Sequence, residues 1–490
     1  MGRRSLGRWR VDVGRGGESL SHGPMLPLPR TLRLGGGSWS GSFPWALSPP
    51  CMGAAPADPL WPLVVAGGGP AGYLAAITAA EAGVGPVLLL EATPEPLGKV
   101  RISGGGRCNV THACWDPRAL VGFYPRGGRA LLGPFSRFAS GDAVAWFAER
   151  GLELVEEPDG RLFPRSNRSS AVIACLQRTA AAAGVQLRSR AALHSVRPLP
   201  AGGFALGLRP PAGESTASGG AAAPTALQAR RLVLATGSHP SGRRLAQALG
   251  HGLIPPVPSL FTLALGADPL LTLAGVVQDP VGLQLELEGQ TERFRQRGPV
   301  LITHWGLSGP ATLRLTAFAA RALQAKSYRG RVRVDWSGGR PTAELEGQLA
   351  TCRQEQARRQ LVTVRPWPAL SRRLWQHLLL QAGLEPERRW ADLPRAGLQR
   401  LVQHLRDSVY PVVGRGPFGE EFVTAGGVPL GEVNLARMES RLVPGLHLVG
   451  ELLDVDGVTG GFNFQHCWTS GWLAGQAIAA AAQDASPAAI

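Results

Sequence analysis

The chain has 490 residues, of which 44% are hydrophobic and 18% are charged, so it can bury a large core divided into two or three domains. No run of about 18 uninterrupted apolar residues occurs, which argues against a transmembrane helix. Six cysteines without a repeating spacing fit reduced thiols in a cytoplasmic protein better than a disulfide framework. The net charge of +16 comes mostly from dispersed arginines without interleaved aromatic residues, which argues against direct nucleic-acid binding.

Residues 1–60 are rich in Arg, Gly, Ser and Pro and show no sustained periodicity. An Arg-rich, acid-poor start is typical of a transit peptide. No apolar core follows Arg3 and Arg4, however, so the pattern of a secretory or twin-arginine signal is missing. We expect a disordered extension, or a start codon placed too early with Met52 as the true start.

The pattern changes at Pro62. The stretch "PLVVAGGG" is a short apolar run that ends in glycines and predicts a buried parallel strand. The following "AGYLAAITAAEAG" consists of helix formers and closes with Gly83, and "PVLLLEA" predicts a second strand. Strand, glycine turn, helix and strand make a βαβ unit.

The spacing Gly67-x-Gly69-x-x-Gly72 fits a dinucleotide fingerprint. The first glycine makes the tight turn, the second lets the backbone approach a diphosphate, and the third allows close helix–strand packing. The diphosphate would lie against free N–H groups at the positive end of the helix. Glu91 ends the next strand, where a carboxylate can accept both ribose hydroxyls of an adenosine. We therefore predict a dinucleotide cradle rather than a structural turn.

Further along, residues 142–164 predict a helix and a hairpin, and residues 171–196 predict a helix followed by strands. The low-complexity stretch "PPAGESTASGGAAAPT" predicts an exposed loop tip. Short alternating segments separated by Gly and Pro predict an antiparallel β domain over 253–340, and Leu-, Arg- and Gln-rich sequence predicts a helical subdomain over 341–415. Apolar strand-like runs followed by glycines then return, which predicts that one α/β domain is split by a long insertion.

Two later stretches favour FAD over NAD: "RLVLATGSHP" and "PGLHLVGELLDVDGVTGGFNFQHCWTSG", each with a strand that ends in glycine-rich sequence. With "GKVRISGGGRCNVT", "THWGLSGPA" and "TAGGV", they make the chain resemble the bacterial FAD-dependent oxidoreductases of the aminoacetone-oxidase-like and bile-acid-reductase-like group. The resemblance runs from about Leu63 to Ala479. It implies a Rossmann-type, glutathione-reductase-like FAD domain (61–252 and 416–490) interrupted by the β domain and the helical subdomain.

The resemblance also implies the cofactor-binding residues. The three cradle glycines would hold the FAD diphosphate, Glu91 the adenosine ribose, and Glu451 the ribitol or diphosphate region. N–H groups before the last helix would face the pyrimidine edge of the flavin, where a helix N-terminus favours the anionic reduced form. The further residues implied are Gly106, Arg107, Asn109, Thr236, Gly237, Gly450, Gly460, Gly461, Phe462 and Asn463.

Several chemically reactive residues have simpler interpretations. Cys108 and Cys114 lie one residue further apart than the redox pair of disulfide reductases, so we expect Cys108 to be a small buried residue. His304 could donate a proton to substrate, yet we expect it to cap a strand end. Asp454 and Asp456 could bind substrate, but Asp beside Gly usually forms turns. We assign no catalytic residue and no metal site.

A second GxGxxG, "GRGPFG" (414–419), is not followed by a helical pattern, and we interpret it as a loop. No separate NAD(P)H domain is evident. We expect an FAD-dependent oxidoreductase that moves a hydride or electron pair through flavin N5 to or from a small organic substrate, such as an unsaturated carbonyl compound or an amine, with NAD(P)H as a transient reductant. The alternatives are an oxidase that uses oxygen, and an FAD-containing RNA-modification or RNA-binding protein, which only the positive charge supports.

Overall fold

The computed structural model describes residues 60–209, 225–416 and 423–484. The expected N-terminal extension lies outside this part except for Leu60. The low-complexity insertion lies outside it except for Thr225, and the second GxGxxG is described only as far as Gly416. Within the described ranges, no helix combines the length and the apolar character needed to cross a membrane.

The larger part of the fold is built on a nine-stranded sheet. Its parallel strands are β1 (Leu60–Ala66), β2 (Val87–Leu90), β6 (Gln186–Arg188), β9 (Thr225–Leu234) and β20 (Leu446–Leu448). They lie in the order β20, β9, β1, β2, β6. Val65 in β1 pairs with Leu89 on one side and Val233 on the other. All three side chains are fully buried, as expected for a parallel sheet covered on both faces.

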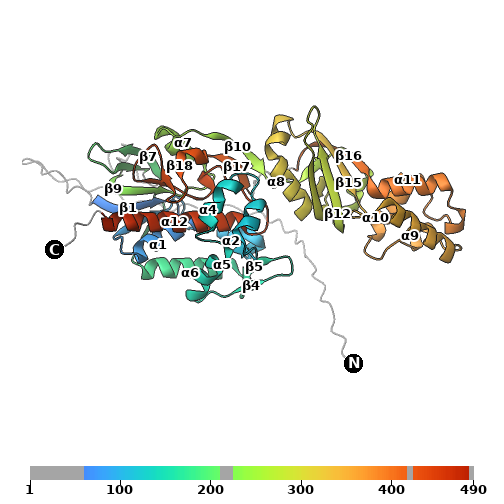
Figure 1. Ribbon diagram of the computed structural model, residues 1–490, viewed down its shortest axis with the longest axis horizontal. Helices are drawn as coiled ribbons and strands as arrows, with labels where there is room; N and C mark the ends of the chain where they lie inside the picture. Colours follow the sequence, from blue (N-terminus) through green and yellow to red (C-terminus); the bar gives the residue numbers. More distant parts are fainter. Residues whose placement is uncertain (1–59, 210–224, 417–422, 485–490) are drawn as a thin grey trace, which may run out of the picture. The chain divides into compact units, whose positions relative to one another are not determined.

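Antiparallel strands extend this sheet: β7 (Leu193–Pro198), β8 (Phe204–Leu208), β18 (Val433–Asn434) and β19 (Glu439–Ser440). The β7–β8 hairpin pairs with the first half of β9, and β18 and β19 follow β20 at one edge. Two helices, α1 (Pro70–Glu81) and α12 (Phe462–Asp484), lie side by side along the sheet (Figure 1). A Cβ on Gly471 would stand 2.4 Å from the Ala71 carbonyl oxygen, so glycine is what allows the two helices to pack this closely.

Smaller elements surround the sheet. The helices are α2 (Gly98–Gly106), α3 (Pro117–Leu120), α4 (Leu132–Phe135), α5 (Ser140–Glu149), α6 (Ser169–Ala182) and α7 (Pro240–Ala248). A three-stranded sheet contains β3 (Thr111–His112), β4 (Leu154–Glu156) and β5 (Arg161–Pro164). Helix α5 and the β4–β5 hairpin are the helix and hairpin predicted over 142–164.

The insertion contains a closed barrel. Its strands are β11 (Leu263–Leu265), β12 (Val277–Glu286), β13 (Phe294–Ile302), β14 (Gly306–Ser308), β15 (Gly330–Asp335) and β16 (Ser408–Arg415). Val281, Leu283 and Leu285 of β12 are buried with the period of two that a strand requires. Helix α8 (Pro310–Ala325) contacts β13. The pair β10 (Ile254–Ser259) and β17 (Val423–Gly427) forms a separate antiparallel ladder.

Strand β16 lies within the range 341–415 that we expected to be helical. It closes the barrel by pairing with both β11 and β15. Ser408, Tyr410 and Val412 are buried and alternate with exposed residues. The sequence therefore has the period of two of a strand, but over only a few residues. The pairing partners lie far away in sequence, which a local pattern does not reveal.

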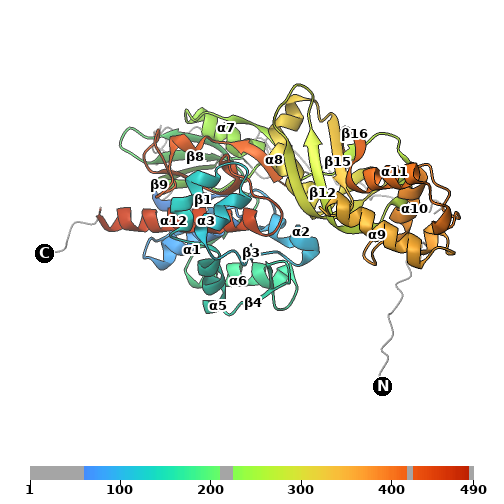
Figure 2. The same cartoon turned by 45° about the vertical axis from the view of Figure 1, so that its right-hand side comes forward.

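Helices α9 (Thr342–Glu355), α10 (Arg372–Gln381) and α11 (Arg395–Arg406) gather beside β15 and β16 (Figure 2). The rings of Trp375 and Trp390 stack with centroids 6.3 Å apart and are fully buried. The fold therefore confirms the predicted α/β class: a Rossmann-type sheet interrupted by an antiparallel β insertion with helical parts.

Candidate functional site

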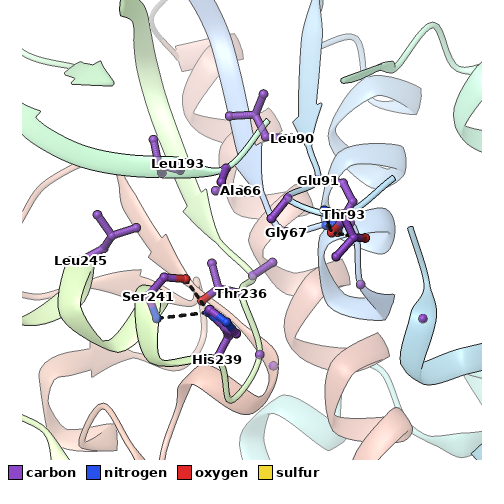
Figure 3. A pocket seen from close by; sticks show the side chains of 18 of the residues that line it. Ala66, Gly67, Leu90, Glu91, Thr93, Leu193, Thr236, His239, Ser241 and Leu245 are labelled. Carbon is purple, nitrogen blue, oxygen red and sulfur yellow. Dashed lines mark hydrogen bonds between the residues drawn. The ribbon is translucent and has the colours of Figure 1, made fainter. Parts of the chain in front are cut away.

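A cavity of about 1590 Å³ lies at the carboxyl edge of the parallel sheet (Figure 3). From β1 the chain builds the sheet outward through β2 and β6, and it returns to the other side of β1 with β9 and β20. The gap between β1 and β9 is therefore the topological switch point, where open α/β sheets bind their ligands. Ala66 and Ala235, at the ends of these two strands, both line the cavity.

The three glycines of the fingerprint have different surroundings. Gly67 has a φ of +118°, and a Cβ there would stand 2.3 Å from the Ala235 carbonyl oxygen. A Cβ on Gly72 would stand 1.9 Å from the Gly67 carbonyl oxygen. Gly69 instead has no atom within 4 Å of a Cβ position, and it lines the cavity at the start of α1. Gly67 and Gly72 are thus required by the fold, whereas only Gly69 is open toward a ligand.

Glu91 follows β2 and its carboxylate lines the same cavity. One of its oxygens accepts from the Gly68 N–H (2.9 Å), and the other accepts from the N–H and hydroxyl of Thr93 (2.7 Å each). These bonds hold the half-buried carboxylate in one position. A carboxylate accepts several hydrogen bonds at each oxygen, so acceptor capacity remains for ligand hydroxyls.

The wall beside the glycine turn comes from the segment after β9, and Figure 3 shows Thr236, His239 and Ser241 on that side. His239 precedes α7, and its Nδ1 lies 2.7 Å from the Ser241 hydroxyl. The Thr236 hydroxyl is buried and forms no hydrogen bond among the described residues. This hydroxyl packs against α7, where a Cβ on Gly242 would stand 1.7 Å from it.

The segment after β20 brings Gly450 and Glu451 to the cavity. Gly450 has a φ of +65°, and its N–H donates to Ser470 of α12 at 3.0 Å. The Glu451 carboxylate forms an ion pair with Lys99 at the start of α2. Cys467, one turn into α12, lines the cavity as well, and burial raises the pKa of its thiol. The first turns of α1 and α2 and residues Phe464 and Cys467 of α12 thus line one cavity.

The residues just before α12 do not line this cavity. Gly461 has a φ of +92°, and a Cβ there would stand 2.7 Å from the Thr111 carbonyl. With its amide nitrogen toward Thr111, the Asn109 side chain donates to the Thr111 carbonyl (2.9 Å) and accepts from the Gly461 N–H (3.0 Å). Asn463 bonds both the N–H and the carbonyl of Gly457. The polar groups of this turn are therefore used in part within the protein.

Phe462 and Arg107 also point away from the cavity. The Phe462 ring is buried in a cluster of three rings, with its centroid 4.3 Å from that of Phe123 and 4.7 Å from that of His112. Arg107 forms an ion pair with Glu157 and lies over the Phe163 ring. The cofactor-binding residues expected from the sequence that line the cavity are Gly67, Gly69, Glu91, Thr236, Gly237, Gly450 and Glu451. Those outside its lining are Gly72, Gly106, Arg107, Asn109, Gly460, Gly461, Phe462 and Asn463.

The other chemically reactive residues named in the sequence analysis lie outside the cavity lining. Cys108 is fully buried, as predicted, and burial raises the pKa of its thiol to about 12. His304 is exposed in the turn between β13 and β14. Our expectation of turn-forming aspartates was incomplete, because Asp454 pairs with Arg321 at 2.6 Å.

Asp456 is fully buried and pairs through both carboxylate oxygens with Arg126. Sequence reasoning missed this pair, whose further hydrogen-bond partners are the Ser259 hydroxyl and the Ala317 carbonyl. It also missed Lys99 and Ser238. The Lys99 ammonium, at the start of α2, lies 3.2 Å from the Ser238 hydroxyl in the segment after β9. Lys99 belongs to the motif "GKVRISGGGRCNVT". Its positive charge directly after a glycine was the feature of the sequence that could have identified it as a binding residue.

The residues present fit a dinucleotide with two negative phosphates. Gly69 leaves space at a helix N-terminus, and Glu91 offers acceptors to ribose hydroxyls. A parallel sheet with this cradle at its switch point defines a dinucleotide-binding flavoprotein of the Rossmann type.

The sequence profile of the HI0933-like protein Rossmann domain matches residues 62–477. The chain therefore belongs to the HI0933-like family, which confirms the resemblance noted from its motifs, and it is an FAD-dependent oxidoreductase.

Relatives with named activities cover nearly the same span. The 3-dehydro-bile acid delta(4,6)-reductase of Clostridium scindens is 31% identical over 430 residues, which cover 85% of this chain and 98% of the relative. The ribosomal RNA dihydrouridine synthase of Escherichia coli is 28% identical over 436 residues, with the same two coverages. Among solved structures, the 3-ketosteroid delta1-dehydrogenase of Sterolibacterium denitrificans aligns with a TM-score of 0.47 at 13% identity, over 86% of this chain and 100% of that one.

Proposed function

We propose that the cavity holds FAD, and that the enzyme reduces a carbon–carbon double bond conjugated to a carbonyl group with NAD(P)H as reductant. The observation that carries this proposal is the meeting of Gly69, Glu91 and Glu451 around one cavity at the switch point of the sheet. Bound FAD supplies hydride transfer through its N5 atom, and the protein supplies binding, orientation and electrostatics.

Each wall of the cavity has a separate role in this proposal. The N–H groups at the start of α1, beside Gly69 and Ala71, face the diphosphate, because the first N–H groups of a helix lack intrahelical partners. Glu91 accepts from the adenosine ribose. Glu451 accepts from the ribitol hydroxyls.

We propose that the flavin end lies toward the turn before α12. Asn109 accepts from the Gly461 N–H and thereby fixes the turn, while the N-terminal dipole of α12 favours negative charge beside it. This arrangement would stabilise the reduced cofactor, whose charge develops near the pyrimidine edge. Asn109 is a positioning residue in this scheme, and Gly106 and Arg107 border the same region.

The substrate class follows from what the names of two relatives share. A delta(4,6)-reductase acts on carbon–carbon double bonds, and a dihydrouridine synthase makes uridine whose ring double bond, conjugated to a carbonyl, is saturated. Both names describe saturation of a carbon–carbon double bond, and in the reaction proposed for the present chain a hydride adds to one carbon of that bond and a proton to the other. This shared chemistry supports an activated alkene as the substrate of the present chain.

Anaerobic rapid mixing tests the proposal. The purified protein should contain FAD, and NADH or NADPH should bleach its absorbance near 450 nm within seconds. Conjugated enones should then restore the absorbance without oxygen, while their saturated analogues should not. Restoration by oxygen alone, with no response to any enone, would favour an oxidase. Absence of bleaching by both nicotinamides would contradict the proposed reductant.

A second candidate function is reduction of a base in RNA, which one relative's name and a group of arginines favour. Backbone hydrogen bonds pair the segment after α9 with the segment before α11: the Leu361 N–H donates to the Arg388 carbonyl (2.8 Å) and the Trp390 N–H to the Arg359 carbonyl (3.0 Å). This pairing gathers like charges, which costs stability. Arg358, Arg359 and Arg389 are exposed there, and none of them forms an ion pair with a described residue.

RNA phosphates would offset that repulsion. If RNA is the substrate, unmodified ribosomal RNA transcripts should reoxidise the reduced enzyme and acquire dihydrouridine, measured by mass spectrometry of the nucleosides. Replacing Arg358, Arg359 and Arg389 together with alanine should weaken RNA binding and reduce its salt dependence. The matched control replaces Arg197, an exposed arginine of β7. Enone reduction without any response to RNA would exclude this second function.

A further inference from the structure

Lys99 occupies a central place in the cavity wall. It is the second residue of α2, its ammonium pairs with the Glu451 carboxylate, and the same nitrogen lies 3.2 Å from the Ser238 hydroxyl. All three residues line the cavity. The ammonium therefore joins the start of α2 to the segments that follow β9 and β20, at the edge where the parallel strands end.

Lysine is very rare in this protein. Of its 51 Lys and Arg residues, only Lys99 and Lys326 are lysines. A chain that uses arginine for nearly every positive charge thus carries one of its two lysines in the cavity wall. The two side chains differ in shape, because a guanidinium is a planar fork that grips a carboxylate with two bonds, whereas an ammonium is compact.

The position of Lys99 is also electrostatically unfavourable for helix stability. Helical backbone in α2 runs only from Gly98 to Ile102, before Ser103 leaves helical geometry, and a positive charge beside the unpaired N–H groups of its first turn is unfavourable. No acidic residue lies in that turn to compensate. The compensating carboxylate is Glu451, whose side chain is only 12% exposed. A contact 352 residues apart in sequence thus supports a charge that the local helix disfavours.

The cavity itself explains why a cation is needed there. Glu91 and Glu451 both line it, and a diphosphate placed between two carboxylates would be repelled by each of them. Arg190, Arg209 and Arg244 also line the cavity, but they are exposed and none of them pairs with Glu451. Lys99 is the cation held against that carboxylate.

We propose that Lys99 is a cofactor-binding residue: its ammonium neutralises Glu451 and donates a hydrogen bond to FAD at the diphosphate–ribitol region. The inference rests on the proposed placement of FAD in this cavity. An ammonium has three N–H donors. Glu451 and Ser238 take two of them, and one remains for the cofactor.

The test compares FAD binding to flavin-depleted protein by fluorescence quenching and by the FAD dissociation rate, neither of which depends on turnover. Lys99→Met should raise the Kd about 10- to 100-fold, the usual effect of losing a hydrogen bond to a charged group. Lys326→Met is the matched control and should bind FAD as the wild type does, because Lys326 follows α8 and does not line the cavity. Equal binding by the wild type and Lys99→Met would overturn the proposal.

Two further variants distinguish neutralisation of the Glu451 charge by Lys99 from a hydrogen bond between Lys99 and FAD. In a Glu451→Gln background, Lys99→Met should cost less affinity, because only the hydrogen bond to FAD is lost and no carboxylate remains to be neutralised. An equal cost in both backgrounds would overturn the neutralising role. Lys99→Arg should bind several-fold more weakly than the wild type, since a planar fork that grips Glu451 with two donors cannot place its remaining N–H groups where the compact ammonium places its third. Arg binding as tightly as Lys would overturn the role of the third N–H.

The outcomes also distinguish this inference from the placement of FAD. Gly69→Val fills the open space at the start of α1 without touching Lys99. If Gly69→Val loses FAD while Lys99→Met retains it fully, the cavity is the cofactor site and only the role of Lys99 is wrong. If both variants retain FAD fully, the placement of the cofactor is wrong. Thermal unfolding of each variant without FAD shows that the fold is preserved.

Discussion

The carbonyl oxygen of Gly67 lies 1.9 Å from the position that a Cβ on Gly72 would occupy. The first glycine of the fingerprint thus packs directly against the third, and the contact closes the turn between β1 and α1. Gly69, between them, has no neighbour within 4 Å of its Cβ position. Within one motif, a side chain at Gly72 would therefore disturb the fold, whereas a side chain at Gly69 would only occupy the space left for a ligand.

Substitutions at Gly69 and Gly72 should fail in different ways. Gly72→Ala should lower the free energy of unfolding by about 2–4 kcal/mol, because overpacking against backbone forces the turn to move. Gly69→Val should leave the unfolding free energy of the flavin-free protein within about 1 kcal/mol of the wild type and abolish the yellow colour. Urea unfolding and the FAD absorbance of the purified proteins measure both effects.

The matched control for this pair is Gly98→Ala, at another cavity-lining glycine with nothing within 4 Å of its Cβ position. It should fold normally. A Gly69→Val protein that purifies with full FAD absorbance would show that no phosphate approaches this turn.

Glu91 provides a second prediction. Its two oxygens accept from Gly68 and Thr93, so Glu91→Gln turns an amide N–H toward existing donors. We expect a loss of stability of about 1–3 kcal/mol from the unpaired groups, and at least a tenfold weaker affinity for FAD. Affinity for FMN, which lacks the adenosine, should change much less than affinity for FAD. Equal losses for both flavins would contradict a contact with the ribose.

The local patterns of the sequence were enough to predict much of the fold. The apolar run before Gly67 and the helix formers after it predicted β1 and α1, because a parallel strand and its helix are encoded within about 30 residues. Lys99, Glu451 and Thr236 each lie in a motif that the sequence shows. The sequence does not show that these three motifs form the walls of one cavity. Their contacts join strand ends that are hundreds of residues apart, and topology alone brings them together.

The buried ion pair of Arg126 and Asp456 illustrates the same limit and gives a third prediction. Arg126 also donates to the Ala317 carbonyl at 2.8 Å, and the Ser259 hydroxyl donates to Asp456 at 2.9 Å. Asp456→Asn should lower the free energy of unfolding by about 3–5 kcal/mol, because it leaves the buried guanidinium without a counter-charge.

The double variant Arg126→Met with Asp456→Leu should cost less than the sum of the two single changes, since it leaves no unpaired charge. Chemical unfolding of all four proteins measures this coupling. Additive losses would show that the two side chains do not act as a pair. The exposed pair Arg165–Glu153 of the same part of the chain serves as the control, and breaking it should cost less than about 1 kcal/mol.

His466 in α12 predicts how stability depends on pH. It is almost completely buried, with its Nε2 3.3 Å from the Gly450 carbonyl, and burial lowers the pKa of its imidazole to about 4. The unfolded chain, with an ordinary pKa of about 6.5, binds the proton more tightly than the folded one. Stability should therefore be complete above pH 6.5 and should decline as the pH falls from about 6.5 toward 4.

At pH 5 this difference in pKa amounts to about 2 kcal/mol. His466→Gln keeps a donor for the Gly450 carbonyl but cannot be protonated. Between pH 7.5 and pH 5, the variant should lose about 2 kcal/mol less stability than the wild type, measured by urea unfolding at matched FAD concentrations. His447 is also buried, and burial lowers its pKa to about 4, so part of the decline should persist in the variant. Identical declines in both proteins would mean that His466 does not titrate differently in the folded and unfolded states.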